Sequence, residues 1–267
     1  MKKSNRQLKS VYKKIFKKGY TKVYTVNTRV HKDKVAKGLK LTAEMVESLK
    51  EANWKGKRVL QSGCGTGTCA YAGACRGGKN AAVDYVKEAI AEAKATYQHQ
   101  NLLYQVGDTN KIPGKFDIVV SLGTLEHLDN PLAVLKKFKR HLKPGGRIIT
   151  TCPNWTNPRG YVLQTLLHLF DAPITLADLH YLTPLEFKDF AKKLNMTLKW
   201  RTFDHDWAHG KRLIKDFKKR LPNVLRDAKL PRNQKNIDRF IKWLENHVLP
   251  LDHTSPFSGA TAIYVLK

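Results

Sequence analysis

The chain has 267 residues, of which 42% are hydrophobic, and carries a net charge of +27 from 49 Lys and Arg against 22 Asp and Glu. This apolar content excludes a disordered chain and is enough for one large domain. No apolar run approaches the roughly 20 residues of a membrane span, and the N-terminus lacks the apolar core of a secretory signal, so we expect a soluble, cytoplasmic protein.

The excess positive charge is concentrated in two segments. Residues 1–40 contain 14 Lys and Arg against one Asp, and residues 209–242 contain 12 against three Asp. Basic segments attract anions, which indicates RNA, an anionic membrane surface or an acidic protein as a partner. The segments contain no aromatic stacking platform for RNA. A solvated face that only aids solubility is the alternative.

The four cysteines match no metal-binding pattern. They form no CxxC pair, and their spacing fits neither a zinc nor an iron–sulfur site. We therefore expect no metal, and interpret the four residues as buried thiols of a reducing compartment.

The N-terminal residues 1–55 are predicted to form basic helices. Residues 2–18 place apolar side chains on one stripe and lysines on the opposite face, a pattern typical of an amphipathic helix. A second helix is predicted over residues 42–52. The apolar stripe can pack on the body of the protein, on a membrane or on a partner.

From residue 57 the chain alternates between strands and helices. Strands are predicted at 58–62, 81–85, 102–106, 116–122 and 147–151, and helices at 68–74, 86–97 and 131–141. Asn130 followed by Pro131 is a typical helix start, and "KPGG" at 143–146 is expected to end that helix and turn into the fifth strand. This alternation predicts βαβ units and therefore a parallel sheet.

After the fifth strand, a polar and aromatic stretch at 154–182 interrupts this rhythm. The remaining elements are predicted as a helix at 183–194, a strand at 197–203, helices at 211–221 and 233–247, and a final strand at 259–267. We therefore expect one domain over residues 56–267, with insertions at about 154–182 and 205–258.

Three glycines, Gly63, Gly65 and Gly67, follow the first strand of this domain. Glycines let the backbone approach a ligand closely, and the next helix offers free N–H groups to an anionic end. Asp84 ends the second strand, where a carboxylate can accept both hydroxyls of a ribose. Asp108 ends the third strand, where it can accept from an adenine amino group. The alternative is that both aspartates only cap their strands.

Five stretches together resemble the class I S-adenosylmethionine-dependent methyltransferases, in the branch of the ubiquinone-biosynthesis O-methyltransferases. They are "VLQSGCGTG", "VDYVKEAI", "GDT", "FDIVVSLGTLEHLDNP" and "LKPGGRIITTCPN". The resemblance spans residues 57–154 and extends loosely to the last two strands. It implies an α/β fold, a Rossmann-like doubly wound sheet of seven strands in the order 3-2-1-4-5-7-6, with the last strand antiparallel.

The resemblance also implies a binding site for S-adenosylmethionine. The glycine turn would hold the methionine portion, Asp84 the ribose, and Asp108 with Thr109 the adenine, with Tyr85 against the adenine ring. The cofactor-binding residues expected in this way are Gln61, Gly63, Cys64, Gly65, Gly67, Asp84, Tyr85, Asp108, Thr109 and Leu122.

Gln61 departs from the family pattern. The family usually carries Asp or Glu at this position, where the carboxylate helps to fix the ammonium group of the cofactor. Glutamine can accept a hydrogen bond without the charge, so we expect weaker binding but not its loss.

Methyl transfer requires a positioned acceptor and, for a hydroxyl or a protonated nitrogen, removal of a proton. Glu126 and His127 follow the fourth strand, at the turn that the resemblance places beside the cofactor. We interpret His127 as the candidate general base, because imidazole titrates near neutrality. A histidine that only holds the turn by hydrogen bonds is the alternative.

Topology predicts where the acceptor binds. The insertion at 154–182 and the segment between the last two strands both leave from the carboxyl edge of the sheet, so we expect them to roof the active site. Polar candidates for this pocket are His180, Tyr181, Asp204, His205, Asp206, His209, Asp252 and His253.

The sequence therefore predicts a methyltransferase that modifies an O or N atom of a small-molecule acceptor. The first alternative is an RNA (tRNA or rRNA) methyltransferase that uses the basic segments. The second is a non-catalytic binding or assembly factor with the same fold.

Overall fold

The computed structural model describes residues 30–175 and 177–267, which form two compact units. The sheet unit comprises the described residues up to Cys152, together with Pro184–Trp200 and Ile263–Lys267. The helical unit comprises Pro153–Thr183 and Arg201–Ala262. The predicted helix at residues 2–18 lies outside the described residues.

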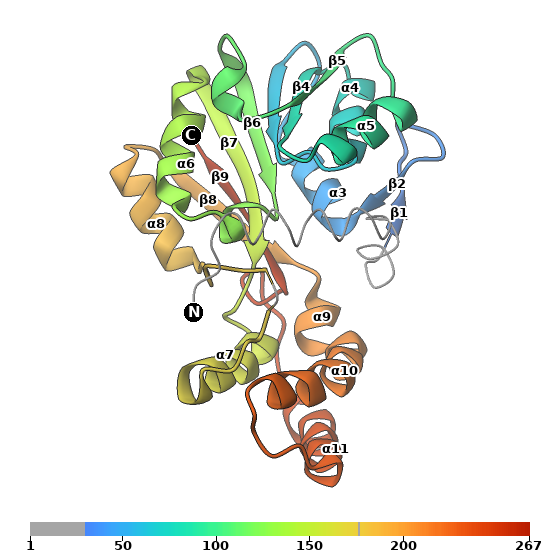
Figure 1. The fold of residues 1–267 in the computed structure, drawn as a ribbon, viewed down its shortest axis with the longest axis vertical. Helices are drawn as coiled ribbons and strands as arrows, with labels where there is room; N and C mark the ends of the chain where they lie inside the picture. The colour runs from blue at the N-terminus through green and yellow to red at the C-terminus, as the bar shows by residue number, and fades with distance from the viewer. Residues whose placement is uncertain (1–29, 176) are drawn as a thin grey trace. The chain divides into compact units, whose positions relative to one another are not determined.

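A seven-stranded sheet organises the sheet unit (Figure 1). Its strand order is β5-β4-β3-β6-β7-β9-β8, which confirms the predicted order. The strands are β3 (Arg58–Ser62), β4 (Lys79–Asp84), β5 (Leu102–Val106), β6 (Phe116–Leu122), β7 (Leu142–Pro153), β8 (Leu198–Phe203) and β9 (Thr261–Leu266). The pairs β3–β4, β4–β5, β3–β6 and β6–β7 are parallel.

The last strand runs antiparallel to its neighbour. The N–H group of Thr197 donates to the carbonyl of Lys267 at 2.7 Å, and the N–H of Lys267 donates back at 3.0 Å. Because Thr197 precedes β8 and Lys267 follows β9, this reciprocal pair is an antiparallel contact. The expected doubly wound α/β fold with one antiparallel strand is confirmed.

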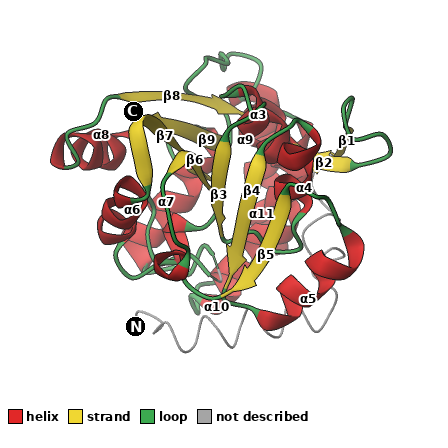
Figure 2. Ribbon diagram, turned by 90° about the horizontal axis from the view of Figure 1, so that it is seen from above, coloured by secondary structure: helices red, strands yellow, loops and turns green. Residues whose placement is uncertain are grey.

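The central strands are apolar because both of their faces are covered. Val59 and Leu60 of β3 and Val119 of β6 are fully buried, as expected for parallel strands between helical layers. The helices α4 (Thr68–Cys75) and α5 (Lys87–Thr96) pack on β4 and β5. Figure 2 shows β3, β4 and β5 side by side.

Strand β7 differs from its prediction. It begins at Leu142, five residues earlier than expected, and includes the "KPGG" stretch. Phe116 of β6 pairs with Leu142, but Ile118 pairs with Arg147, so residues 143–146 form a bulge. The preceding helix α6 (Pro131–Arg140) ends before this stretch, so the prediction that "KPGG" ends the helix was wrong. Asn130 caps α6 as predicted, since its side chain accepts the Ala133 N–H at 2.9 Å.

The described part of the N-terminal segment contains a hairpin that the sequence did not reveal. Strands β1 (Val30–Lys32) and β2 (Lys40–Thr42) pair antiparallel and lead into α3 (Ala43–Lys50). The Thr42 hydroxyl accepts the Met45 N–H and so caps α3. Residues 30–42 are therefore not part of the helical segment predicted for 1–55.

The helical unit has its own apolar core. Its helices are α7 (Pro158–Phe170), α9 (His205–His209), α10 (Lys211–Asp227) and α11 (Gln234–Trp243), followed by a π-helical turn at Leu244–Val248. Helix α10 buries Leu213, Phe217, Leu221 and Val224 on one face. This apolar stripe extends past Pro222, which explains why α10 runs six residues beyond the predicted end at residue 221.

An ion pair joins the hairpin to the end of α4 within the sheet unit. Asp33, in the β1–β2 loop, accepts two hydrogen bonds from the Arg76 guanidinium at 2.8 and 2.5 Å and one from the Ala36 N–H at 3.2 Å. Asp33 is buried, and the hydrogen bonds from Arg76 hold the pKa of its carboxyl below the usual range. Because Arg76 directly follows α4, the pair fixes the loop to that helix.

We predict that Asp33→Asn lowers the free energy of unfolding by roughly 1.5–3 kcal/mol at neutral pH, the usual contribution of a hydrogen bond to a charged group. The lowered pKa stabilises the folded state above the unfolded pKa of about 3.9, and this contribution is lost as the pH falls through the lower folded value. The difference between the unmodified chain and the variant should therefore shrink on acidification, as measured by urea unfolding.

The exposed pair of Asp189 and Lys193, 2.6 Å apart, provides the control. Asp189→Asn should change stability by less than about 1 kcal/mol, because solvent screens surface pairs. Equal losses in the two variants would contradict the anchoring role of Asp33.

Candidate functional site

The glycine turn adopts the left-handed backbone for which only glycine is well suited. Gly63, Gly65 and Gly67 have φ values of 69°, 52° and 81°. A Cβ on Gly63 would come within 2.8 Å of the Thr124 hydroxyl, and one on Gly67 would clash with the Tyr104 ring. The turn is therefore closely surrounded by the protein, and side chains at these positions would displace it.

Asp84 connects the turn to the end of β4. One carboxylate oxygen accepts the Gly65 N–H and the other the Val86 N–H, both at 2.9 Å. Asp84 is buried, and burial raises the pKa of its carboxyl, while the hydrogen bonds from Val86 and Gly65 oppose this change. The hydrogen bond to the Val86 N–H is the local capping of the strand end that was the alternative role for Asp84. The bond to Gly65 spans 19 residues and places the carboxylate at the glycine turn.

The residues expected at the adenine lie at the same edge of the sheet. The Gly107 N–H donates to the Asp84 carbonyl at 2.8 Å, so the ends of β4 and β5 are adjacent. The Asp108 side chain is 53% exposed, accepts the Thr109 hydroxyl at 3.2 Å and lies 3.8 Å from the Lys137 ammonium. Tyr85 is 42% exposed. Two accessible polar side chains therefore follow the ends of β4 and β5.

The three remaining cofactor candidates lie on β3, in the turn and at the end of β6. Gln61 is buried in β3, paired in register with Ala82 of β4 and Val120 of β6. Cys64 is buried, and burial raises the pKa of its thiol, which keeps it neutral. Leu122 is the last residue of β6, and its carbonyl accepts the Thr124 hydroxyl at 2.9 Å.

The two catalytic candidates lie on the short 3-10 helix at Leu125–His127. Glu126 is buried and accepts a hydrogen bond from the Cys152 thiol at 3.4 Å. The Nε2 atom of His127 is 4.0 Å from a Glu126 oxygen, and the His127 side chain is 17% exposed. A partly exposed imidazole beside a buried carboxylate fits both the general base and the turn-holding histidine.

Glu44 is a further carboxylate at this edge of the sheet, which the sequence analysis did not identify. It lies in the first turn of α3, and one of its carboxylate oxygens accepts the Thr151 hydroxyl at the end of β7. The same Thr151 hydroxyl accepts the Gly123 N–H at 2.9 Å, just after β6. No sequence spacing could reveal this contact, because Glu44 and Thr151 are 107 residues apart.

Three of the candidates for the acceptor pocket make hydrogen bonds or ring contacts within the helical unit. His209 lies between the Asp252 carboxylate and the Ser258 carbonyl, and His205 contacts the Ser255 carbonyl at 2.8 Å. These bonds attach residues 252–258 to α9. Tyr181 packs its ring edge-on to Trp155, with 5.2 Å between the ring centroids. Within residues 30–175 and 177–267, no group of three or more His, Cys, Asp or Glu side chains could hold a metal ion.

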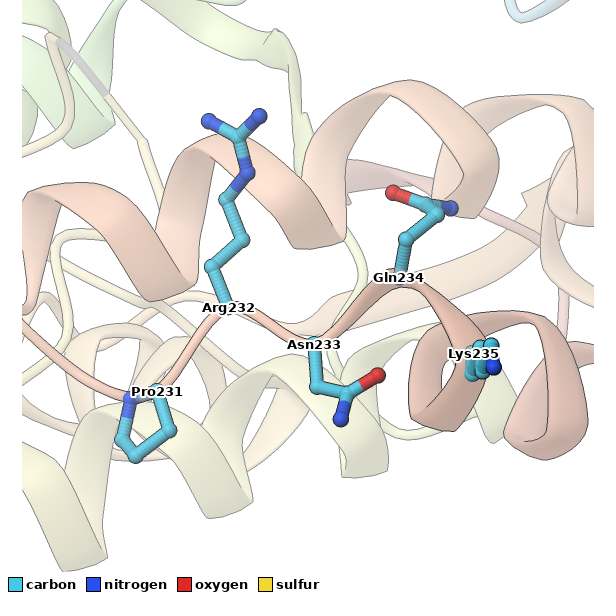
Figure 3. A pocket seen from close by; sticks show the side chains of 5 residues that line it. All are labelled: Pro231, Arg232, Asn233, Gln234 and Lys235. Atoms are coloured by element: carbon cyan, nitrogen blue, oxygen red, sulfur yellow. The ribbon is translucent and has the colours of Figure 1, made fainter.

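A surface hollow of about 640 Å³ lies between α10 and α11 (Figure 3). Five consecutive residues line it: Pro231, Arg232, Asn233, Gln234 and Lys235. Figure 3 shows the Arg232 and Asn233 side chains pointing in opposite directions. A ligand site needs polar groups that converge, so we do not assign the active site to this hollow.

The second basic segment presents most of its charge to solvent. Of its 12 Lys and Arg residues, ten are exposed: Lys211, Lys215, Lys218, Lys219, Arg226, Lys229, Arg232, Lys235, Arg239 and Lys242. The two others are partly buried, Arg212 at 3.2 Å from Asp206 and Arg220 at 2.9 Å from Asp216. In the part of the chain that the structure describes, no helix is both long and apolar enough to cross a membrane.

Comparison with known proteins finds similarity to methyltransferases. Residues 60–150 match the model of a methyltransferase domain. The chain is 32% identical over 123 residues to the ubiquinone biosynthesis O-methyltransferase of Pseudomonas aeruginosa (strain LESB58), covering 43% of this chain and 52% of that protein. It is 30% identical over 154 residues to the enzyme of that name from Dechloromonas aromatica (strain RCB), covering 53% and 65%. The chain thus spans about half to two thirds of the length of these relatives.

Solved structures share the fold. A SAM-dependent methyltransferase from Archaeoglobus fulgidus matches with a TM-score of 0.51 at 18% identity, over 80% of this chain and 88% of that one. One from Mesorhizobium loti matches with a TM-score of 0.51 at 14% identity, over 83% and 94%. Residues 60–150 therefore match a methyltransferase domain, the chain is similar to ubiquinone biosynthesis O-methyltransferases, and it shares the fold of solved SAM-dependent methyltransferases.

Proposed function

We propose that the protein is an S-adenosylmethionine-dependent methyltransferase acting on an O or N atom of a small-molecule acceptor. The observation that carries this proposal is the buried Asp84 carboxylate, hydrogen-bonded at 2.9 Å to the N–H of Gly65 in a turn of three left-handed glycines. A carboxylate in this place can accept both hydroxyls of a ribose, while the turn brings the backbone close to the neighbouring part of the ligand.

The other residues at this edge fit the rest of the cofactor. The glycine turn and the first N–H groups of α4 would hold the methionine portion, Asp108 with Thr109 the adenine amino group, and the exposed Tyr85 ring the adenine face. The bound cofactor supplies an activated methyl group. The remaining tasks of the protein are to position the acceptor and to remove its proton.

We assign the proton transfer to His127. Its partly exposed imidazole can accept a proton, and the Glu126 carboxylate, 4.0 Å from Nε2, favours the resulting cation. Glu126 is buried and also bonded to Cys152, so its proposed part is to position His127.

The choice of a small-molecule acceptor is supported by the relatives named for O-methylation in ubiquinone biosynthesis. RNA is the second candidate, favoured by the ten exposed Lys and Arg residues of the segment 209–242. The two acceptors differ in their response to salt, because phosphate contacts release counterions and RNA binding therefore falls steeply as salt is added.

The test of this function is incubation of the protein with cell extract and S-adenosylmethionine carrying a labelled methyl group. Label in a small metabolite is expected, and label in RNA would favour the second candidate. Calorimetry with S-adenosylmethionine completes the test. Binding without transfer would indicate a non-catalytic factor, and no binding would overturn the proposal.

Asp84→Asn should weaken S-adenosylmethionine binding about tenfold to a hundredfold, because hydrogen bonds to a charged acceptor contribute roughly 1.5–3 kcal/mol. Burial raises the pKa of Asp84 above the usual aspartate value of 3.8. Protonation of the carboxyl removes acceptor capacity, so affinity should fall on acidification, starting at a higher pH than for an ordinary aspartate. Calorimetry at several pH values should show this dependence in the unmodified chain and not in the variant.

Asp117→Asn is the matched control for this prediction. Asp117 lies at the opposite edge of the sheet, where its carboxylate accepts the Arg58 N–H at 2.8 Å and pairs with Lys143 at 2.9 Å. This variant should lose stability and keep its affinity. An equal loss of affinity in both variants would contradict a direct role for Asp84.

His127→Asn should slow methyl transfer by about 10²- to 10⁴-fold, the usual contribution of general base catalysis. The dissociation constant of S-adenosylmethionine should stay within about twofold, because the proposed role of His127 is in proton transfer. His141→Asn, at the amino edge of the sheet beside Phe116, should leave both unchanged. If His127 only holds its turn, affinity and melting temperature will fall together with the rate.

A further inference from the structure

The structure brings two carboxylates to a single point just after β6. A Cβ on Gly123 would lie 3.5 Å from one Glu44 oxygen and 3.8 Å from a Glu126 oxygen. Two carboxylates this close to one point repel each other and attract a cation. The electrostatic potential just after β6 therefore favours a positively charged group.

This point is next to the glycine turn. Thr124, which follows Gly123, comes so close to Gly63 that its hydroxyl would lie 2.8 Å from a Cβ there. The charge of Glu44 also acts on the helix that follows the glycine turn. Burial raises the pKa of the Cys69 thiol to about 12, with the negative charge of Glu44 as the next cause. Since Cys69 is in the first turn of α4, the charge of Glu44 acts on the start of that helix.

Glu44 fits a ligand contact better than the other carboxylates at this edge. Asp84 is assigned to the ribose in the proposed function, and its two oxygens also accept the N–H groups of Gly65 and Val86. Glu126 is buried and contacts Cys152. Glu44 is only partly buried, and its carboxylate accepts the Thr151 hydroxyl close to Gly123 and the glycine turn.

We infer that Glu44 binds the ammonium group of S-adenosylmethionine and supplies the negative charge that Gln61 lacks. This inference rests on the proposed function. The methionine portion carries an ammonium and a carboxylate, and the N–H groups at the start of α4 suit only the anion. An anionic acceptor binds the ammonium more strongly than a neutral one, and the amide of Gln61 in β3 carries no charge.

The charge-removing variant Glu44→Gln tests this assignment. Its amide oxygen can still accept the Thr151 hydroxyl, so the packing of α3 on β7 is retained. Calorimetry should compare S-adenosylmethionine, S-adenosylhomocysteine and methylthioadenosine. The first two contain the ammonium, and only the first is a sulfonium. Methylthioadenosine lacks the whole amino-acid part.

We expect Glu44→Gln to bind S-adenosylmethionine and S-adenosylhomocysteine each about tenfold more weakly, with methylthioadenosine unchanged. Gln61→Glu in the Glu44→Gln background should restore most of the loss by returning one negative charge to the turn. The matched control is Glu47→Gln on the same helix, where Glu47 pairs with Lys50 at 2.6 Å, and it should change none of the three affinities.

Three results would overturn the inference. If only S-adenosylmethionine binds more weakly, Glu44 interacts with the sulfonium. If all three affinities fall together with the melting temperature, Glu44 is structural. If the unmodified chain binds S-adenosylmethionine and Glu44→Gln binds it equally well, the inference fails while the proposed function stands. Only a failure of the unmodified chain to bind would remove both.

Discussion

The hydrogen bond from the Gly65 N–H to Asp84 is the interaction on which the site depends. It closes a turn whose three glycines adopt a left-handed backbone, and it holds that turn against the end of the neighbouring strand. The N–H groups of Gly63 and Cys64 add two further bonds to the Val83 carbonyl. Helix α4 starts from this turn, so the direction of its N–H groups follows from the same contacts. One buried carboxylate thus aligns a strand end, a turn and a helix start.

Much of the sheet could be predicted from the sequence. Strands β3, β5 and β6 begin and end at the predicted residues, because a short run rich in apolar residues marks each of them in the sequence. The start of α6 could also be predicted, since Asn130 and Pro131 are local signals that act within one helical turn. The candidates Asp84 and Asp108 could be chosen because they follow strand ends, and parallel strands end at one edge, whereas the other cofactor candidates came from the family resemblance.

What could not be predicted depends on contacts between distant parts of the chain. The hairpin at 30–42 is held by the pairing of Asp33 with Arg76, 43 residues away. The bulge at 143–146 exists because Leu142 reaches Phe116 across the sheet, which no local turn signal encodes. Helix α10 continues past Pro222 because its apolar face has a core to pack on. Glu44 was not identified for the same reason, since it lies on α3 and its partner Thr151 lies on β7, 107 residues later.

The position of β9 has a consequence for how the chain folds during synthesis. This strand lies between β7 and β8, although it follows both in the sequence. Its Tyr264 ring stacks on Phe187 with 3.6 Å between the centroids and is fully buried. The ribosome therefore releases β8 before its neighbour in the sheet exists, and the edge of β7 stays unpaired until residues 261–266 emerge. The sheet is completed only after synthesis has passed through both segments of the helical unit.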